Sequence, residues 1–227
     1  MESLQSNLFS QFKRAFIVGG GPSPAAQWLR QQILPSDCLI AADRGAAYLQ
    51  AEGLSPDLLL GDFDSLPPEL WPNLRKNCRQ WLTFPCDKDY SDLELALRAA
   101  HHLGLRQAAV AAALYGRIDH CLFNVIAILQ LADELNIEAS LIAPDCQIYQ
   151  LKEKKHFWKD CQGKILSIIA LDDQVEVSLQ GVKWPLDHSK LHRSSTRGLS
   201  NLIVDHQASL ECHSGRIIAI LNSAEIQ

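Results

Sequence analysis

Six aspartates stand at or near the ends of apolar segments, where carboxylates can bind a metal ion. Asp62 and Asp64 follow the apolar run Pro56–Leu60 after a single glycine and are separated from each other by one residue. Two carboxylates this close repel each other, which raises a pKa unless a cation or hydrogen-bond donors intervene. Because Mg²⁺ takes one or two protein carboxylates together with substrate phosphates, the pair is a candidate magnesium site. The alternative from this stretch alone is a solvated turn, since Asp and Ser are common turn residues.

The other four aspartates follow other apolar segments in the same way. With the segment that each follows, they are Asp43 after Cys38–Ala42, Asp89 and Asp92 after Gln80–Phe84, and Asp119 after Ala108–Leu114. In open α/β sheets the ligand binds outside the carboxyl ends of the strands, so acidic loops after several strands can converge on one edge. Acidic residues at a helix start are also favoured by the helix dipole alone, which gives Asp89 and Asp92 a purely structural alternative.

Polar residues beside these aspartates add further candidates. Ser91 and Glu94 have the spacing of a capping box, which predicts a helix start. Arg117 is a cation that can hold phosphate oxygens with its fork of donors. Asp119 is predicted to cap the next helix, which places His120 and Asn124 one turn apart on a shared face. A capping Asp beside a His is more often structural than functional.

A glycine-rich loop follows the first apolar segment. Gly19–Pro22 lies between the predicted strand Arg14–Gly19 and a predicted helix over Pro24–Gln32. Such a loop can bring backbone N–H groups against a phosphate. It matches neither of the common nucleotide-binding glycine patterns, so a plain tight turn is the alternative.

These residues are positioned by alternating strands and helices. The predicted strands are Arg14–Gly19, Cys38–Ala42, Pro56–Leu60, Gln80–Phe84, Ala108–Leu114 and Ala139–Ala143. Helical patterns separate most of them, for example over Gly45–Glu52 and from Ser91 onward. Strand, helix and strand at this spacing indicate a parallel sheet, so residues 1–143 are predicted to form a Rossmann-like α/β domain.

From Pro144 onward the pattern becomes β-type throughout. Short apolar runs separated by Gly, Asp and Ser turns predict an all-β domain of sandwich or barrel type over residues 144–227. Trp184 could offer a stacking face to an aromatic ligand, with Ser200 and Asn201 as hydrogen-bonding groups. Each of these, taken singly, is more often a core or turn residue.

Composition limits the class of partner. The chain has 227 residues and a net charge of −5, which argues against nucleic acid or an anionic membrane as the main partner. Seven scattered cysteines with no metal-type spacing suit a reduced compartment. No run approaches membrane-spanning length, and Met1–Arg14 lacks the apolar core of a secretion signal. We therefore expect a cytoplasmic protein.

The ordered motifs resemble those of the thiamine pyrophosphokinase (thiamine diphosphokinase) family. The resemblance covers nearly all of the chain from Arg14 to Leu221. Its motifs are Ala42–Ala46 (Ala-Asp-Arg-Gly-Ala), Gly61–Ser65 (Gly-Asp-Phe-Asp-Ser), Asp87–Asp92 (Asp-Lys-Asp-Tyr-Ser-Asp), Gly116–His120 (Gly-Arg-Ile-Asp-His) with Asn124, Gly181–Trp184 and Ser200–Asn201. The second and fourth of these, in this order, are highly specific.

The resemblance implies an α/β catalytic domain followed by a β-sandwich thiamine-binding domain, in a homodimer with sites near the domain and subunit junction. It implies transfer of the pyrophosphoryl group of ATP to the hydroxyethyl oxygen of thiamine, giving thiamine diphosphate and AMP with Mg²⁺ as cofactor. Carried over by motif, Asp62, Asp64, Asp92, Asp119 and Arg117 are expected to be catalytic, and the first three to hold the metal. Expected nucleotide-side residues are Asp43, Gly61, Asp89, Ser91, His120 and Asn124, and expected thiamine-side residues are Trp184, Ser200 and Asn201.

Two departures from the family motifs and two alternative functions remain. Arg44 stands where the family often has a second glycine, so the family pattern does not predict the backbone conformation after Asp43. Ser200 and Asn201 lie in Thr196–Asn201 (Thr-Arg-Gly-Leu-Ser-Asn), which only partly matches the family. The first alternative is a related pyrophosphokinase that acts on another hydroxyalkyl heterocycle, such as a pterin. The acidic loops do not distinguish it, because they are expected to bind ATP and metal and not the acceptor. A non-catalytic thiamine- or nucleotide-binding module is the alternative from another class, and the presence of every acidic loop speaks against it.

Overall fold

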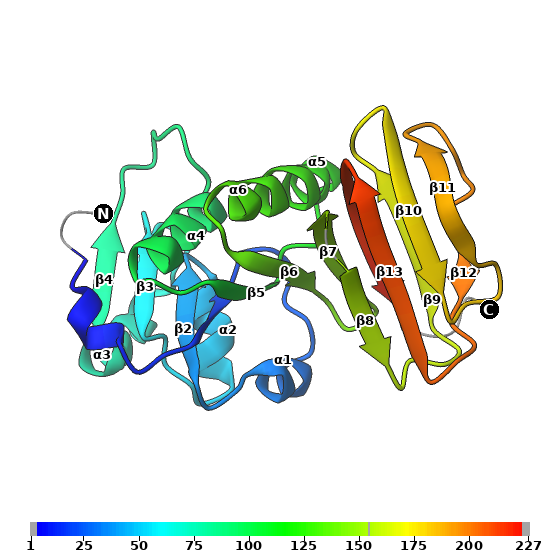
Figure 1. Ribbon diagram of the computed structural model, residues 1–227. Helices are drawn as coiled ribbons and strands as arrows, with labels where there is room; N and C mark the ends of the chain where they lie inside the picture. Colours follow the sequence, from blue (N-terminus) through cyan, green and yellow to red (C-terminus); the bar gives the residue numbers. More distant parts are fainter. Residues whose placement is uncertain (1–3, 154, 224–227) are drawn as a thin grey trace. The chain divides into compact units, whose positions relative to one another are not determined.

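The computed structural model describes residues 4–153 and 155–223 (Figure 1). Residues 1–3, 154 and 224–227, which include the outer ends of both predicted domains and the start of Met1–Arg14, lie outside this part. The chain divides into two compact units, Met1–Ala143 and Pro144–Gln227. Among the described residues, none of the helices is both long and apolar enough to cross a membrane.

The first unit contains a six-stranded sheet in which every neighbouring pair is parallel. Its strands are β1 (Arg14–Val18), β2 (Asp37–Ala42), β3 (Leu58–Gly61), β4 (Gln80–Thr83), β5 (Gln107–Ala111) and β6 (Glu138–Ile142). They lie in the order β6-β5-β1-β2-β3-β4. The predicted parallel α/β sheet is therefore confirmed, with each strand within a few residues of its predicted position.

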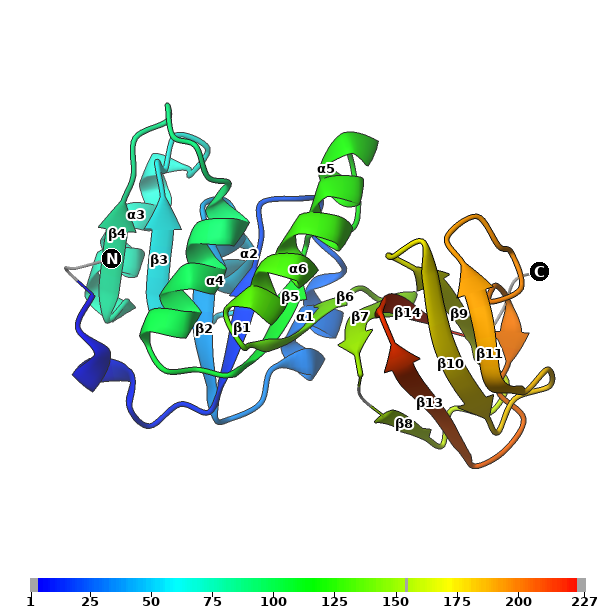
Figure 2. The same ribbon diagram turned by 45° about the horizontal axis from the view of Figure 1, so that its top comes forward.

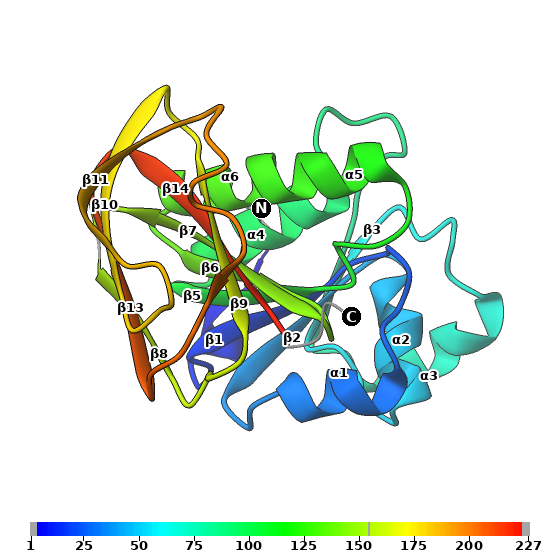
Figure 3. The same ribbon diagram turned by 90° about the vertical axis from the view of Figure 1, so that its right-hand side faces the viewer.

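Helices cover both faces of this sheet. They are η1 (Ser6–Phe9), α1 (Ala26–Gln32), α2 (Gly45–Ala51), η2 (Pro68–Leu70), α3 (Trp71–Asn77), α4 (Asp92–His102), α5 (Ile118–Phe123), the π-helical turn η3 (Asn124–Ile128) and α6 (Leu129–Glu134). Figure 3 shows α4, α5 and α6 on one face of the sheet and α1, α2 and α3 on the other. Because both faces are covered, the central strands are almost wholly apolar, as in Leu58–Leu60.

The strand order reverses at one point of the sheet. β1 pairs with β2 on one side and with β5 on the other, so the chain proceeds outward in opposite directions from β1. Loops leaving the carboxyl ends of β1 and β5 therefore part from each other and leave a crevice at that edge. Ligands of doubly wound sheets bind at this position.

The strands of the second unit form two layers, each with four strands in antiparallel pairs (Figure 2). One contains β7 (Cys146–Lys152), β14 (Arg216–Asn222), β9 (Ile165–Ala170) and β12 (Asn201–Leu202). The other contains β8 (Lys155–Lys159), β13 (Gln207–Ser214), β10 (Gln174–Gln180) and β11 (Leu186–His192). A single apolar core, which includes Leu166 and Leu210, takes side chains from both layers. The predicted C-terminal all-β sandwich is confirmed.

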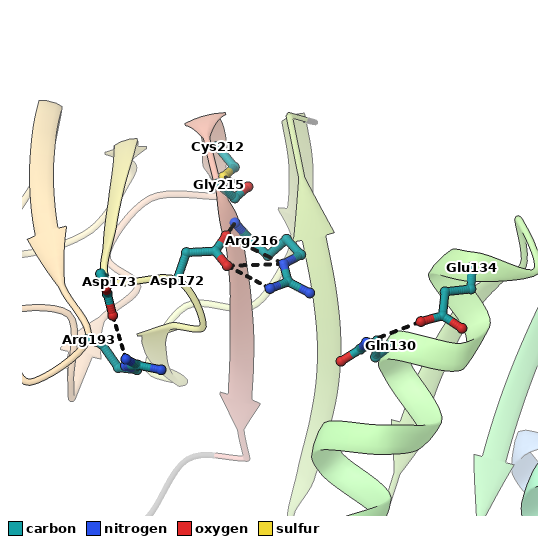
Figure 4. A network of polar contacts seen from close by, with 8 residues as sticks. All are labelled: Gln130, Glu134, Asp172, Asp173, Arg193, Cys212, Gly215 and Arg216. Atoms are coloured by element: carbon teal, nitrogen blue, oxygen red, sulfur yellow. Dashed lines mark hydrogen bonds and ion pairs between the residues drawn. The ribbon is translucent and has the colours of Figure 1, made fainter.

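An ion pair between Arg216 and Asp172 connects a turn of the second unit to the start of a strand (Figure 4). The Arg216 side chain donates to Asp172 at 2.6 Å through Nη2, and the Arg216 backbone N–H donates to the same carboxylate at 2.8 Å. These hydrogen bonds lower the pKa of Asp172. The pair joins the β9–β10 turn to the start of β14.

The structure differs from the predictions at three places. The helix α3 was not predicted; Pro72 stands in its first turn, where the missing N–H costs nothing. β8 and β11 were not predicted, because each buries few side chains. Asp119 does not cap α5: Arg117 occupies the N-cap position and Asp119 is the second helical residue.

Candidate functional site

A pocket of about 670 Å³ opens at the carboxyl edge of the parallel sheet. Every loop that leaves β1 to β5 at this edge contributes to its wall. The wall includes Gly20–Pro22 after β1, Asp43 after β2, Asp62 after β3, Cys86, Lys88 and residues 90–93 after β4, and Ala112, Ala113 and residues 115–117 after β5, with His120 and Asn124 from the following helical segments. The pocket thus lies at the point where the strand order reverses.

Asp62 and Asp64 are brought together by a strained turn. Phe63 between them has φ of 65°, a left-handed conformation that few non-glycine residues adopt, and its ring packs edge-on against Trp71. Ligand atoms of Asp62, Asp64 and Cys86 all lie within 4.8 Å of one another. The predicted pair of carboxylates therefore has a third potential ligand beside it, the Cys86 thiol from the β4–α4 loop. This thiol was not predicted from the sequence.

The two carboxylates have different pKa values. A hydrogen bond from the Asp64 backbone N–H to Asp62 lowers the pKa of Asp62. The negative charge of Asp62 in turn raises the pKa of Asp64. A hydrogen bond with Asp62, together with the charge of Asp62, also raises the pKa of the Cys86 thiol. Negative charge at this point of the pocket wall is thus only partly compensated, which favours a bound cation.

Asp43 and Gly61 form a second corner of the acidic wall. Asp43 has φ of 48°, and the Ser65 hydroxyl donates to its Oδ2 atom. Its Oδ1 atom is buried and has no hydrogen-bond partner in the described chain. Gly61 does not line the pocket; a Cβ there would lie 3.2 Å from the Asp43 Cβ. Gly61 therefore permits the end of β3 to approach Asp43.

Lys88 lies between two of the carboxylates. Its Nζ atom is 3.2 Å from Asp92 Oδ1 and 3.8 Å from Asp62 Oδ2. Burial alone lowers the pKa of Lys88, but the ion pair with Asp92 and the nearby charge of Asp62 outweigh it and raise that pKa. Burial is also the main reason why the pKa of Asp92 is raised. Sequence reasoning missed Lys88, although it stands inside the Asp87–Asp92 motif.

Ser91 supports Asp92 from the start of α4. Its hydroxyl accepts from the Glu94 backbone N–H at 3.2 Å, and its own N–H donates to the Glu94 carboxylate at 2.8 Å. The predicted capping box is confirmed, and it places Asp92 in the first turn, facing the pocket.

Arg117 and Asp119 form an exposed ion pair. Arg117 Nη2 lies 2.5 Å from Asp119 Oδ2, and this hydrogen bond lowers the pKa of Asp119 to about 2. Arg117 and His120 line the pocket, whereas Asp119 does not. Asn124 is buried and donates through Nδ2 to the Ala113 carbonyl at 2.8 Å, which ties the π-helical turn to the loop after β5. Single π turns of this kind often occur at functional sites.

The glycine-rich loop is tightly packed. A Cβ on Gly21 would lie 2.6 Å from the Ala112 carbonyl oxygen, and one on Gly19 would lie 2.9 Å from it. The Gly21 N–H already donates to that carbonyl. Gly19 and Gly21 thus permit close packing of this loop against Ala112, and Gly20 and Gly21 also form part of the pocket wall.

In the second unit, Asn201 holds the backbone of Trp184. The Trp184 N–H donates to Asn201 Oδ1 at 3.0 Å, and Asn201 Nδ2 donates to the Trp184 carbonyl at 2.6 Å. Asn201 is buried, whereas 56% of Trp184 is exposed. Ser200 has φ of 57°, and its N–H donates to the Ser167 hydroxyl. The three predicted thiamine-side residues are thus adjacent, with an exposed indole and a buried amide behind it.

The structure places the predicted residues of the first unit in two groups. One group lines the pocket and comprises Asp43, Asp62, Ser91, Asp92, Arg117, His120 and Asn124. The other lies outside the wall and comprises Gly61, Asp64, Asp89 and Asp119, of which Asp64 remains within ligand distance of Asp62.

Comparison with known proteins assigns a family to both units. Residues 29–140 match the family described as "Thiamin pyrophosphokinase, catalytic domain", and residues 147–217 match "Thiamin pyrophosphokinase, vitamin B1 binding domain". The chain is 27% identical over 206 residues to thiamine pyrophosphokinase of Bacillus subtilis, covering 90% of this chain and 96% of that protein.

Solved structures agree with these matches. The crystal structure of the Bacillus subtilis thiamine pyrophosphokinase has a TM-score of 0.84 at 26% identity, covering 94% of this chain and 100% of that one. That of thiamin pyrophosphokinase from Geobacillus thermodenitrificans has a TM-score of 0.81 at 28% identity, covering 94% and 99%. Since both units match their domains in the same order, the chain belongs to the thiamin pyrophosphokinase family.

Proposed function

We propose that the pocket at the carboxyl edge of the parallel sheet binds ATP with Mg²⁺, and that the chain transfers the pyrophosphoryl group to thiamine. The hydroxyethyl oxygen of thiamine attacks the β-phosphorus of ATP, and the bond from that phosphorus to the α,β-bridging oxygen breaks. AMP leaves with the bridging oxygen, and one of the pocket carboxylates accepts the hydroxyl proton. The observation that carries the proposal is the convergence of carboxylates from three strand ends on a pocket of nucleotide size.

The donor set of the pocket fits a hard divalent cation. Asp62, Asp64 and Asp92 supply carboxylate oxygens, which Mg²⁺ prefers, and the buried Asp43 Oδ1 still lacks a partner in the described chain. We assign Asp62 and Asp64, with Asp92, as the residues that hold the metal. When bound, Mg²⁺ would neutralise the charge that develops on the transferred phosphoryl oxygens.

Other pocket residues position the nucleotide. Arg117 presents its guanidinium at the pocket wall, where it can hold phosphate oxygens, and Asp119 orients that guanidinium through their ion pair. His120 lies on the same wall, one turn before Asn124. Asn124 acts through the Ala113 carbonyl, by holding the loop after β5 in place. Because positioning supplies much of the rate in phosphoryl transfer, these contacts matter even without covalent chemistry.

We assign Trp184 as a stacking platform for a thiamine ring, with Asn201 as the residue that orients it. The indole is more than half exposed, although a tryptophan of this size is usually mostly buried. Both ends of the Asn201 amide hold the Trp184 backbone, so the ring is presented from a fixed main chain.

Replacing Trp184 with alanine is expected to raise KM for thiamine about three- to tenfold, because stacking contributes about 0.5–1.5 kcal/mol beyond burial. KM for ATP should change less than about twofold, since the indole belongs to the other unit. Initial rates of AMP release at varied thiamine and at varied ATP measure the two constants. Trp184→Phe keeps an aromatic face and should recover most of the loss. An unchanged KM for thiamine in Trp184→Ala would remove the indole from the binding site.

The first unit also carries an exposed apolar strip that suits a homodimer. Ile118, Leu122 and Ile126 follow one another at four-residue spacing along α5 and η3, and each is 52–72% exposed. Monomeric proteins rarely expose a contiguous apolar face of this kind. We therefore propose that a second copy of the chain covers the strip, close to the pocket residues Arg117 and His120 of the same helical segment.

Replacing Leu122 with glutamate is expected to convert a dimer into a monomer, because it places a charge in the apolar face. Size-exclusion chromatography with light scattering should change from about twice the 25.3 kDa of one chain to about that mass. Leu34→Glu is the matched control, since Leu34 is 49% exposed and lies outside the strip. A Leu122→Glu variant with the mass of the wild type would show that the strip is not the interface.

The overall reaction is tested by mixing the protein with ATP, Mg²⁺ and thiamine and separating the products. Stoichiometric AMP and thiamine diphosphate would support the proposal. A hydroxymethyl pterin in place of thiamine tests the related pyrophosphokinase. Absence of AMP with every acceptor, despite nucleotide binding, would favour a non-catalytic binding module.

A further inference from the structure

Lys88 occupies the position of a cation between two metal-ligand candidates. Its ammonium lies 3.2 Å from Asp92 Oδ1 in the first turn of α4 and 3.8 Å from Asp62 Oδ2 in the loop after β3. Its side chain is only 14% exposed. The lysine thus links the start of α4 to the end of β3 across the wall of the pocket.

The other cation of the pocket wall is engaged elsewhere. Arg117 is paired with Asp119, and its side chain is 74% exposed. Of these two basic residues, Lys88 is the one in contact with Asp62 and Asp92. Without it, carboxylates on the β2, β3 and β4 loops would face one another with little compensation.

A divalent cation and the Lys88 ammonium cannot occupy the same carboxylate oxygens. Mg²⁺ bound directly to a carboxylate lies about 2.0–2.1 Å from its oxygen, which would bring it close to the ammonium in its present position. The two positive charges repel each other in a half-buried site. Lysine has a flexible four-carbon stem and binds phosphate as a point charge, so its nearest alternative partner is the polyphosphate in the same pocket.

We propose that Lys88 is a displaceable cation that bridges Asp62 and Asp92 in the free protein and moves to the nucleotide phosphates when the metal binds. This inference rests on the proposed ATP–Mg²⁺ function of the pocket. Lys88 then opposes metal binding in the free protein, because the metal must break two ion pairs. It favours metal and nucleotide together, because the released ammonium gains phosphate oxygens. Metal and nucleotide binding are thereby coupled, and the coupling is reciprocal.

The test compares Lys88→Met with wild type, using Mn²⁺ as the metal and α,β-methylene-ATP as a nucleotide that cannot be cleaved at the reacting bond. Mn²⁺ binding to the free protein is followed by the electron paramagnetic resonance signal of unbound Mn²⁺. Nucleotide binding is followed by calorimetry with and without metal. In Lys88→Met the Kd for Mn²⁺ alone should fall at least about threefold, and the Kd for the metal–nucleotide complex should rise about tenfold, which reduces the coupling between the two.

Two further variants separate this role from a structural one. Lys88→Arg keeps a positive charge and should restore the weaker Mn²⁺ binding of the wild type. Lys76→Met removes an exposed lysine of α3 outside the pocket and should change neither constant. Weaker or unchanged Mn²⁺ binding in Lys88→Met would overturn the inference while the metal site itself stands. Wild-type protein that binds no Mn²⁺ would instead overturn the proposed function on which the inference rests.

Discussion

Replacing Asp62 with asparagine is expected to reduce kcat/KM for AMP formation by about 10³-fold. Asp62 lines the pocket, lies within ligand distance of Asp64 and Cys86, and contacts Lys88. Asparagine keeps an oxygen that can accept from the Asp64 N–H, so the turn around Phe63 should persist while the charge is lost. Losing one electrostatic contact to a developing charge typically costs about 10²–10³-fold, and loss of a metal ligand costs at least as much.

Two measurements establish the cause of that loss. Steady-state AMP release at saturating Mg²⁺ gives the rate, and Mn²⁺ binding gives the metal affinity, which should fall in parallel. Asp133→Asn, at an exposed aspartate of α6 outside the pocket, controls for the general effect of removing one negative charge and should change the rate less than about twofold. Near-normal turnover of both Asp62→Asn and Asp64→Asn would remove this pair from the metal site.

The sequence predicts the parallel sheet because burial on both faces makes its strands nearly all apolar. Leu58–Leu60 and Ala108–Ala111 are buried at every position, and continuous apolar runs of this kind are typical of strands covered on both faces. Turn residues then mark where each run ends, so the positions of the acidic loops follow from the sequence alone. The order of the strands, by contrast, depends on pairing between distant segments, which no local pattern contains.

The strands that escaped prediction are those with the least buried surface. β11 (Leu186–His192) buries only its two leucines, and β8 (Lys155–Lys159) buries only Trp158. Both lie at the edges of their sheet, where polar and charged side chains discourage pairing with another chain. These two strands therefore contain too few buried side chains to show an alternating apolar pattern in the sequence.

Contacts within the site were harder to predict than its location. The Asp62–Asp64 pair was evident from spacing, but Lys88 and Cys86 reach it from the next loop across a distance of more than twenty residues. The prediction that Asp119 caps α5 was wrong by two residues, because Arg117 occupies the N-cap position and makes no side-chain hydrogen bond there. Arginine is not among the preferred N-cap residues, so the sequence does not mark the start of this helix.

The chain after Asp43 requires a glycine at residue 45 and not at residue 44. Arg44 adopts ordinary right-handed helical angles, with φ of −54° and ψ of −20°, and its side chain is exposed. No glycine is required there, so the departure from the family pattern is accommodated. Gly45 is different: a Cβ at this residue would lie 2.0 Å from the Val18 carbonyl oxygen and 3.1 Å from that of Gly19. The first residue of α2 thus rests directly on the end of β1.

Replacing Gly45 with alanine is accordingly expected to lower the free energy of unfolding by about 3 kcal/mol or more, because the neighbouring atoms are backbone and cannot turn aside. Urea unfolding followed by circular dichroism measures the change. Arg44→Ala, one residue earlier, should change stability by less than about 0.5 kcal/mol, since its side chain is exposed. Any folded Gly45→Ala protein must also displace α2 from β1, which moves Asp43 and should weaken Mn²⁺ binding. A Gly45→Ala variant with wild-type stability and metal affinity would mean that α2 has room to retreat without disturbing the acidic wall.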